Sequence, residues 1–238
     1  MRTSLTLTGA MILALAGPVP AATLLHGYDF SSGVTDAVGG QHGSLLNGAS
    51  VVGGVLLLDG VDDFVQFGSH LVPTSGSYSV ALAARQDSFT GNYVELISQG
   101  YSGPGFYIGH DWAHQIRMTD LATNTGVAFG PVGAWNHYAM VVDASAGTSK
   151  LFVNGALAFT APSAIVTTTL GDHTRLGTQF ATHAEFLHGA IDNVRIYAGA
   201  LSDGQVLALA SSVPEPAGYA LLLAGLAAVV VAARRREG

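Results

Sequence analysis

Short runs of strand-forming residues, separated by clusters of Gly, Asp, Asn and Ser, fill the middle of the chain at a spacing of roughly 8 to 12 residues. This rhythm is typical of a β-sandwich, because each run is long enough for one strand and each cluster supplies a turn. The clearest hairpin spans residues 151–159, where Asn154-Gly155 separates two apolar runs and favours a type I′ turn. We therefore predict an all-β domain with strands at residues 55–58, 64–67, 79–84, 93–98, 106–110, 115–119, 135–143, 150–153, 156–160, 174–177 and 189–197.

Two further signals mark a turn and a helix. Asp59-Gly60, directly ahead of Asp62-Asp63, indicates a second turn. Residues 202–205 read Ser-Asp-Gly-Gln, which is the spacing of a capping box, and an apolar run follows. The sequence therefore predicts one short helix that ends near Ser211.

Composition excludes several classes of protein. Of the 238 residues, 49% are hydrophobic and only 11% are charged, whereas a soluble domain normally carries about a quarter charged residues. Between Ala22 and Ser212, twelve Asp and two Glu face four Arg and one Lys, so we expect no nucleic-acid partner, which would require a basic surface. The chain has no Cys, and neither a disulfide framework nor a thiolate metal site is available.

The N-terminus has the pattern of a signal peptide. Arg2 supplies the positive end, residues 5–16 form an apolar run too short to span a bilayer, and residues 19–22 offer small residues for signal peptidase. The alternative is a buried helix, for which the Gly and Pro residues of this segment are poor. We expect a signal peptide at residues 1–21, with cleavage near Ala21, followed by a single domain at residues 22–212.

The C-terminal residues 213–238 have three parts. Val213, Pro214, Glu215 and Pro216 break any preceding helix, residues 217–233 contain no charge, and Arg234, Arg235 and Arg236 follow at once. Seventeen uncharged residues are at the low end of what crosses a hydrocarbon core of about 30 Å, and the arginines favour the cytoplasmic side. The sequence thus predicts a transmembrane helix at 217–233 and a domain that faces outward.

This three-part arrangement closely resembles the PEP-CTERM sorting domain of exopolysaccharide-producing bacteria. The resemblance implies recognition by an exosortase, which processes the tail near the motif after a membrane-anchored stage in the inner membrane. It also implies delivery to the cell surface or the extracellular matrix. The alternative is a plain C-terminal membrane anchor, with which the apolar span is equally compatible.

The domain carries a second resemblance, in seven ordered blocks that cover nearly all of residues 24–210. The blocks resemble those of laminin-G-like, concanavalin A-like lectin/glucanase domains. The resemblance implies a two-sheet antiparallel jelly-roll sandwich, in which most of the block residues have structural roles. The blocks are Tyr28-Asp29-Phe30, residues 34–43, residues 58–65, residues 135–139, residues 151–155, residues 189–197 and Ala200-Leu201-Ser202.

Enzymes of this fold imply a test for catalysis. A retaining glycosidase needs two carboxyl groups about 5 to 5.5 Å apart. In the glucanases of this fold these groups are two Glu that flank an Asp on one strand, where alternation places them on one face. The domain contains only Glu95 and Glu185, and neither has a second acid on its own run. We therefore expect no enzymatic activity, although distant carboxylates can still converge in three dimensions.

Two metal hypotheses arise. His110 and His114 would lie on one side of a continuous strand, where His183 and His188 can join them around zinc or another divalent ion; ordinary surface histidines are the alternative. Calcium suits an Asp-rich domain better. Relatives of this fold bind a structural ion where the first strand meets the last, which nominates Asp29 and Asp192, with Asp36 or backbone carbonyls as further ligands. The alternative is that these aspartates cap turns.

Two function classes remain open. The leading hypothesis is an exported, non-catalytic lectin-like or adhesion module of the cell surface or matrix, associated with exopolysaccharide or biofilm. The alternative is a glycan-active hydrolase that is delivered to the same place. Tyr101 and Trp112 lie next to turn residues and are the candidates for stacking on sugar rings, with core packing as the alternative role of both.

Overall fold

The structure is a computed structural model that describes residues 21–89, 91, 93–100, 105–119, 125–165, 173–179 and 185–211. These residues form strands and one helix, α1 (Asp203–Ala210). The strands are β1 (Thr23–Tyr28), β2 (Gly43–Leu46), β3 (Ser50–Val52), β4 (Val55–Asp59), β5 (Phe64–Phe67), β6 (Tyr78–Ser88), β7 (Val94–Gln99), β8 (Phe106–His110), β9 (Ile116–Met118), β10 (Trp135–Asp143), β11 (Thr148–Val153), β12 (Ala156–Ala161), β13 (Arg175–Leu176) and β14 (His188–Ala198).

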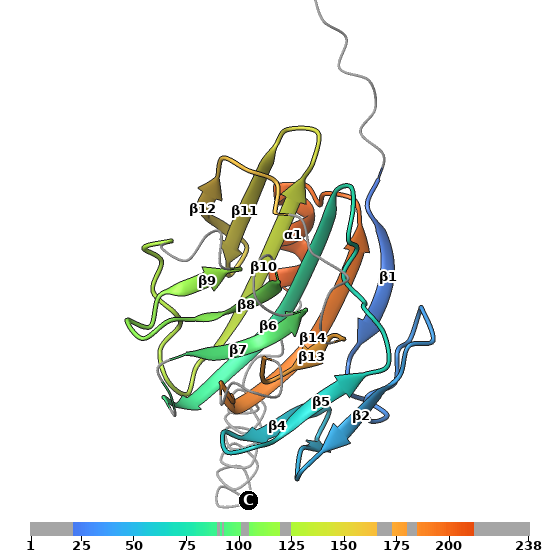
Figure 1. Ribbon diagram of the computed structural model, residues 1–238, viewed down its shortest axis with the longest axis vertical. Helices are drawn as coiled ribbons and strands as arrows, with labels where there is room; N and C mark the ends of the chain where they lie inside the picture. Colours follow the sequence, from blue (N-terminus) through green and yellow to red (C-terminus); the bar gives the residue numbers. More distant parts are fainter. Residues whose placement is uncertain are drawn as a thin grey trace, which may run out of the picture.

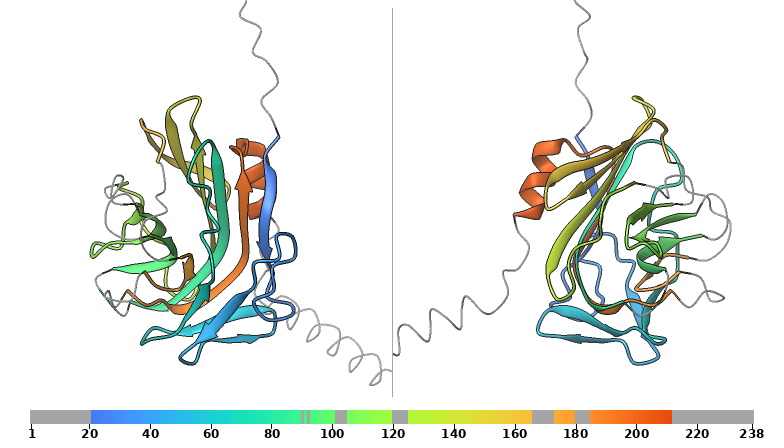
Figure 2. Two further views of the ribbon diagram at one scale, coloured as in Figure 1. Left: turned by 45° about the vertical axis from the view of Figure 1, so that its right-hand side comes forward. Right: turned by 90° about the vertical axis from the view of Figure 1, so that its left-hand side faces the viewer.

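The strands make two antiparallel sheets that face each other (Figures 1 and 2). The larger sheet has the order β12-β11-β10-β6-β14-β4-β3, and β1 pairs with the part of β14 that β4 leaves free. The smaller sheet has the order β2-β5-β13-β7-β8-β9. The chain crosses between the sheets at the turn from β4 to β5, because these two strands belong to different layers. The predicted all-β, jelly-roll-like sandwich is confirmed.

The core lies between the two sheets and follows from period-two alternation. In β6, Tyr78, Val80 and Leu82 point into the main core, whereas Ala81 points to the other side of the larger sheet. Each fully buried Leu, Ile or Phe side chain contributes about 1.5 to 3 kcal/mol through removal of apolar area from water. The core therefore holds the two layers together without disulfides.

Helix α1 covers part of the outer face of the larger sheet (Figure 2). Its buried Val206 packs with residues such as Ala139 and Phe152 in a second, smaller core. The predicted capping box is present: the Ser202 hydroxyl accepts from the Gln205 backbone N–H, and the Gln205 side chain accepts from the Ser202 backbone N–H. The helix ends at the C-cap residue Ser211, as predicted.

Local turn chemistry explains which predictions hold. Asn154 and Gly155 have φ values of 50° and 79°, and both are positive as a type I′ turn requires. All predicted strands are present with shifts at their ends, but β1, β2 and β3 were not predicted. The zinc hypothesis needs a continuous strand through His110 and His114, but β8 ends at His110, as predicted, and residues 112–114 form a turn.

Candidate functional site

A tight turn between β8 and β9 holds Trp112 in solvent. The Asp111 carboxylate oxygen Oδ1 accepts hydrogen bonds from the backbone N–H groups of Ala113 and Gln115, both at 2.9 Å. The Asp111 backbone N–H donates to the Gln115 carbonyl at 3.0 Å and so closes the loop. Asp111 is 7% exposed and Trp112 is 69% exposed. The indole is therefore presented on a loop that its own hydrogen bonds have already ordered.

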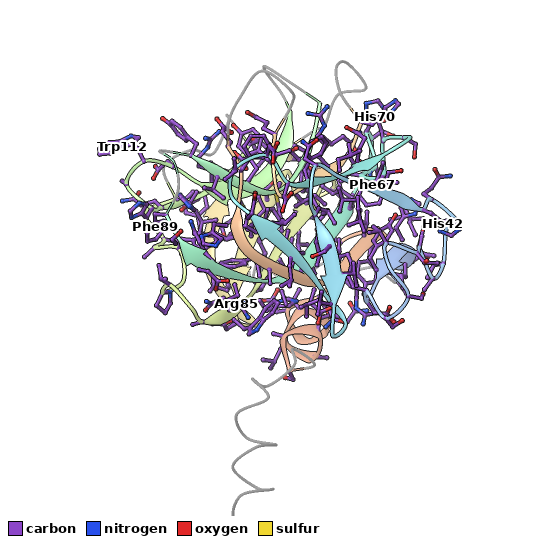
Figure 3. The ribbon with its side chains drawn as sticks, turned by 90° about the horizontal axis from the view of Figure 1, so that it is seen from below. His42, Phe67, His70, Arg85, Phe89 and Trp112 are labelled. Carbon is purple, nitrogen blue, oxygen red and sulfur yellow. The ribbon has the colours of Figure 1, made fainter. Side chains whose placement is uncertain are left out.

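Two further rings lie beside this turn. The His114 ring stacks on the Phe89 ring with centroids 3.6 Å apart and an interplanar angle of 10°. Phe89 is 39% exposed, and it lies on the same side of the molecule as Trp112 when the structure is viewed from below (Figure 3). We call Trp112, His114 and Phe89 the aromatic edge. Its flat, partly exposed rings are the type of surface on which sugar rings stack.

His110 supports the aromatic edge from below. Its ring packs edge-on against Phe89 and His114, with centroid distances of 5.3 and 5.4 Å. His110 Nδ1 lies 2.9 Å from the Asp111 carbonyl oxygen. Because a carbonyl oxygen can only accept a hydrogen bond, Nδ1 carries the proton. The other ring nitrogen, Nε2, accepts a hydrogen bond from the Gln86 side-chain amide at 3.0 Å. Burial lowers the pKa of His110. Because both ring nitrogens are engaged, His110 serves the packing of the site and not a zinc ion.

The outer face of the smaller sheet buries an ion pair. Glu95, Gly109 and Arg117 are neighbours in register across β7, β8 and β9. A Cβ atom at Gly109 would overlap the Glu95 carboxylate, so glycine at this position lets Glu95 Oε1 and an Arg117 nitrogen approach to 3.6 Å. The Glu95 side chain is fully buried, and the guanidinium lies over the rings of Tyr93 and Tyr107, 4.6 and 4.5 Å from their centroids.

Glu185, the other glutamate of the domain, reaches the same place. Its backbone carbonyl accepts from the Glu95 N–H at 3.2 Å. Burial lowers the pKa of Arg117, but the negative charge of Glu95, a hydrogen bond with Tyr107 and the negative charge of Glu185 outweigh burial and hold the pKa above its ordinary value. The two glutamates thus converge on Arg117, although 90 positions separate them in the sequence. No sequence pattern signals this convergence, since it depends on strand register and on Gly109.

The nominated calcium ligands Asp29 and Asp192 also come together. Asp29 follows β1, and Asp192 begins a β-bulge in β14 in which Asn193 has a φ of 51°. Burial and the nearby charge of Asp29 together raise the pKa of Asp192 to about 6, although the Asn193 backbone hydrogen bond and the charge of Arg195 lower it. Hydrogen bonds, first from the Ser31 backbone, lower the pKa of Asp29. The pair therefore combines one exposed carboxylate with one buried carboxyl group, and the positive charge of Arg195 acts on both.

Asp36, named as a further ligand, is committed elsewhere. Its carboxylate accepts from the backbone N–H groups of Gly27, Val38 and Gln41 and contacts His26 Nδ1 at 2.7 Å. Burial tends to raise the pKa of Asp36, and the hydrogen bonds from His26 and the backbone outweigh burial, so the pKa is lowered. A carboxylate with this many donors fixes the segment after β1 against β1. It has little capacity left for a metal ion.

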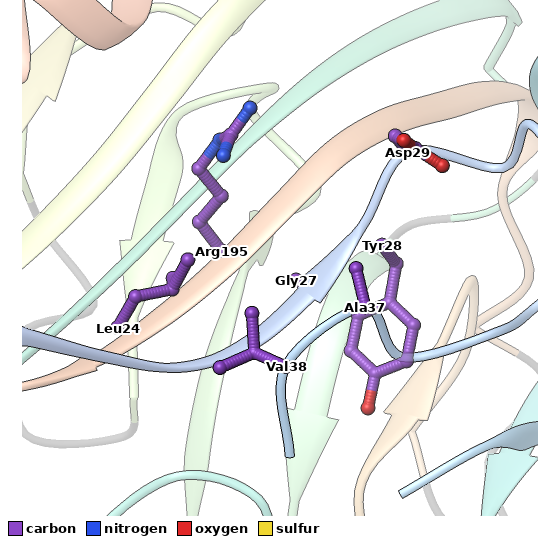
Figure 4. Close-up of a pocket in the computed structure, with 7 residues that line it drawn as sticks. All are labelled: Leu24, Gly27, Tyr28, Asp29, Ala37, Val38 and Arg195. Carbon is purple, nitrogen blue, oxygen red and sulfur yellow. The ribbon is translucent and has the colours of Figure 1, made fainter. Parts of the chain in front are cut away.

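A small pocket lies between β1 and the segment around Ala37 and Val38 that follows it (Figure 4). Asp29 and Arg195 supply its charged groups, and apolar side chains supply most of the remaining lining. The lining residues are Leu24, Gly27, Tyr28, Asp29, Ala37, Val38 and Arg195. Its volume of about 100 Å³ holds a few water molecules, and it is small for a sugar ring.

A third acidic group lies in the turn between β4 and β5. Consecutive residues on a strand point to opposite faces, which would separate Asp62 from Asp63. In the structure they lie outside the strands, and together with Asp59 they place carboxylate oxygens within 4.8 Å of one another. In the part of the chain that the structure describes, this is the one group of three or more potential metal ligands with such closely spaced atoms.

Several predicted residues lie outside the described residues. They are the signal peptide up to residue 20, Tyr101, His183, and the tail residues Val213, Pro214, Glu215, Pro216, Arg234, Arg235 and Arg236, with the apolar span 217–233. Across the described ranges, no helix has the length and hydrophobicity needed to cross a membrane.

Comparison with protein families decides the classification. Residues 59–207 match the model of the concanavalin A-like lectin/glucanases superfamily. The chain belongs to this superfamily. A second model, the PEP-CTERM protein-sorting motif, matches residues 212–236 and confirms the interpretation of the tail. This motif implies exosortase processing and an exported protein that is directed to the cell surface.

Solved structures share the fold of this superfamily member. Domain 4 of the extracellular arabinanase AbnA from Geobacillus stearothermophilus, solved in complex with arabinotriose, is 24% identical, with a TM-score of 0.59 over 79% of this chain and 98% of that one. A sialidase of Trypanosoma rangeli is 18% identical, with a TM-score of 0.61 over 81% of this chain and 33% of that one. The binding domain of Paraclostridial Mosquitocidal Protein 1 is 14% identical, with a TM-score of 0.59 over 80% and 52% of the two chains. A search of curated proteins finds no match in sequence.

Proposed function

We propose that the protein is a non-catalytic carbohydrate-binding module, which an exosortase releases to the cell surface or the exopolysaccharide matrix. The observation that carries the proposal is Trp112, which is 69% exposed on a turn ordered by Asp111. Trp112 lies on the same side of the molecule as the partly exposed Phe89, and grouped exposed aromatic surface is typical of interaction sites. A rigid loop also reduces the entropy that binding costs. Both features favour stacking of the indole on a sugar ring.

The ligand class rests on the location as well as on the ring. A protein sorted to the surface of an exopolysaccharide producer meets extended glycans at high local concentration. The domain is acidic, with fourteen Asp and Glu against five Lys and Arg between Ala22 and Ser212. Neutral polysaccharides suit this surface better than polyanionic ones, because like charges repel. The arabinanase domain of the same fold, solved with arabinotriose, is consistent with a neutral glycan as ligand.

The buried state of Glu95 supports a binding role over a catalytic one. A glycosidase must bring its carboxyl groups into contact with the glycosidic bond. The Glu95 side chain is fully buried next to the Arg117 guanidinium, which stabilises its charged form. Substrate would have to displace Arg117 from Tyr93 and Tyr107 before it touched this carboxylate. We infer that the ion pair stabilises the smaller sheet.

A glycan hydrolase remains the second candidate, and one observation favours it. Glu95 and Glu185 are the only glutamates between Ala22 and Ser212, and they converge on the same arginine. Hydrolysis of a panel of polysaccharides by the full chain, abolished by Glu95→Gln with the fold intact, would establish the enzyme. If the chain hydrolyses none of the polysaccharides that it binds, the result supports a non-catalytic carbohydrate-binding module.

A structural calcium ion at Asp29 and Asp192 forms part of the proposal. Both side chains offer oxygen atoms, which Ca²⁺ prefers, and the raised pKa of Asp192 reflects burial and a negative neighbour, which a cation would offset. Asp192 and Asp29 would hold the ion, and its role would be to fix the end of β1 against the bulge of β14. Calcium should raise the melting temperature of the wild-type chain, and this rise should be smaller in Asp192→Asn.

The binding proposal is tested by glycan binding of the full chain and two variants. Trp112→Ala should weaken binding at least tenfold without lowering the melting temperature, since the indole is exposed. Trp135→Phe is the matched control, because the other tryptophan is half-buried under the Arg85 guanidinium, 5.4 Å from the ring centroid. It should bind like the wild type. Equal binding by Trp112→Ala would refute the site.

A further inference from the structure

The turn between β4 and β5 concentrates negative charge where the chain passes from one sheet to the other. Asp59 ends β4 in the larger sheet, and Phe64 begins β5 in the smaller one (Figure 1). Asp59, Asp62 and Asp63 each contribute a carboxylate oxygen to a group whose atoms lie within 4.8 Å of one another. We call these three residues the Asp turn. Within the described residues, none of the three takes part in an ion pair.

The hydrogen bonds of the Asp turn leave several carboxylate oxygens open. Asp59 Oδ1 accepts from the backbone N–H of Val61 at 2.8 Å and, more weakly, from that of Asp62 at 3.4 Å. Asp63 Oδ2 accepts from the Asp59 N–H at 3.0 Å. The Asp62 side chain makes no hydrogen bond to the described residues, and its backbone carbonyl accepts from Asn47. Three charges thus meet with only backbone N–H groups to balance them.

An independent observation at Asp63 points to a missing partner. Asp63 is 95% buried, with a relative exposure of 5%, and its Oδ1 has no hydrogen-bond partner among the described residues. This oxygen faces the backbone of Gly48, where a Cβ atom would lie only 2.8 Å away. Buried carboxylate oxygens in native proteins are normally hydrogen-bonded, ion-paired or bound to metal.

We propose that the Asp turn binds one divalent cation of the calcium class, with Asp59, Asp62 and Asp63 as its carboxylate ligands. Ca²⁺ accepts six to eight oxygen ligands in flexible geometry, so exposed Asp59 and Asp62 leave room for water on the open side. The ion would bridge the end of β4 to the start of β5 and thereby fix the crossing between the sheets. This site is distinct from Asp29 and Asp192, and it does not rest on glycan binding.

Calorimetric titration of the metal-free full chain with CaCl₂ tests the site. Asp62→Asn is the decisive variant, because it removes a ligand charge while breaking no side-chain hydrogen bond of the described residues. It should bind calcium at this site at least tenfold more weakly and lose the part of the calcium-dependent rise in melting temperature that Asp192→Asn retains. Asp63→Asn should do the same if it folds.

Two controls make the result specific. Asp143→Asn changes an aspartate whose Oδ1 accepts from the i+2 and i+3 backbone N–H groups, as Asp59 does, but which has no place in an acidic group. It should leave calcium binding unchanged. Asp192→Asn should leave the Asp-turn titration intact. The proposal is overturned if the wild type binds no calcium at millimolar concentration, if Asp62→Asn binds as the wild type does, or if Asp192→Asn removes all binding.

Discussion

The turn after β8, which we call the Asp111 turn, and the Asp turn, called the Asp59 turn in this comparison, are ordered by the same type of hydrogen bond. They present different side chains to the solvent. In each, one aspartate at the end of a strand accepts two backbone N–H groups through Oδ1, from Ala113 and Gln115 in one turn and from Val61 and Asp62 in the other. The first turn holds up an indole that is 69% exposed, and the second gathers three carboxylates.

The difference shows that the hydrogen-bonded aspartate sets the shape of the turn, while the neighbouring residues set which side chains the turn presents. The Asp143 turn completes the series. Asp143 Oδ1 accepts from the backbone of Ser145 and Ala146, and the turn carries neither an aromatic ring nor an acidic group. The Asp143 turn is therefore the reference for the loss of unfolding free energy when only the hydrogen bonds to the aspartate are removed.

Removal of the Asp111 side chain should have the largest effect. Asp111→Ala breaks two hydrogen bonds to a carboxylate that is 7% exposed, and hydrogen bonds to charged groups contribute about 1.5 to 3 kcal/mol each. We expect a loss of about 3 kcal/mol in the free energy of unfolding, measured by urea denaturation, together with weaker glycan binding. Asp143→Ala, in an exposed turn, should cost about 1 kcal/mol. Equal losses in the two variants would show that the Asp111 turn is not specially ordered.

Asp192 differs from the turn aspartates, because it is buried in the bulge of β14. Its pKa is raised to about 6 in the folded chain, so between about pH 4 and pH 6 the folded chain keeps a proton that the unfolded chain releases. Stability in calcium-free buffer should therefore fall as the pH rises through this window, by up to about 2.5 kcal/mol. Asp192→Asn should remove this fall. A variant that keeps the full pH dependence in thermal unfolding would assign it to another group.

A smaller effect should separate the Asp59 turn from the Asp143 turn. Asp62→Asn removes one of the three carboxylate charges, and it preserves the turn because the Asp62 side chain makes no hydrogen bond to the described residues. In chelator at low ionic strength, it should raise the free energy of unfolding by about 0.5 to 1 kcal/mol. Asp143→Asn should be neutral or slightly destabilising. If the two variants behave alike in chemical denaturation, the three carboxylates do not repel strongly.

Local signals in the sequence were sufficient for the elements that local chemistry controls. The Asn154-Gly155 turn and the Ser202 capping box depend on neighbouring residues alone, and both formed as predicted. Strands β2 and β3 have only four and three residues, too few for an alternating pattern, and pairing with β5 and β4 defines them. Their existence is a tertiary effect.

The sites were less accessible to sequence reasoning. Trp112 was named as a candidate, but the partners that build the aromatic edge were not, because Phe89 and His114 meet only when the β8 to β9 turn packs against the end of β6. The turn at Asp59-Gly60 was predicted, but its three aspartates were not proposed as a metal site, because the sequence does not show how closely their carboxylates approach one another. The Asp-Gly signal at residues 59–60, followed by two acids, contained the information that all three aspartates share one turn.

The most direct test of the proposed function follows Trp112 itself by fluorescence. In the Trp135→Phe chain Trp112 is the single tryptophan, since the sequence holds only two. Titration with the polysaccharide that binds best should give a saturable blue shift of its emission and protect it from acrylamide, with a midpoint that matches the binding constant. Binding that leaves the emission and the quenching of Trp112 unchanged would contradict the account and place the glycan elsewhere on the domain.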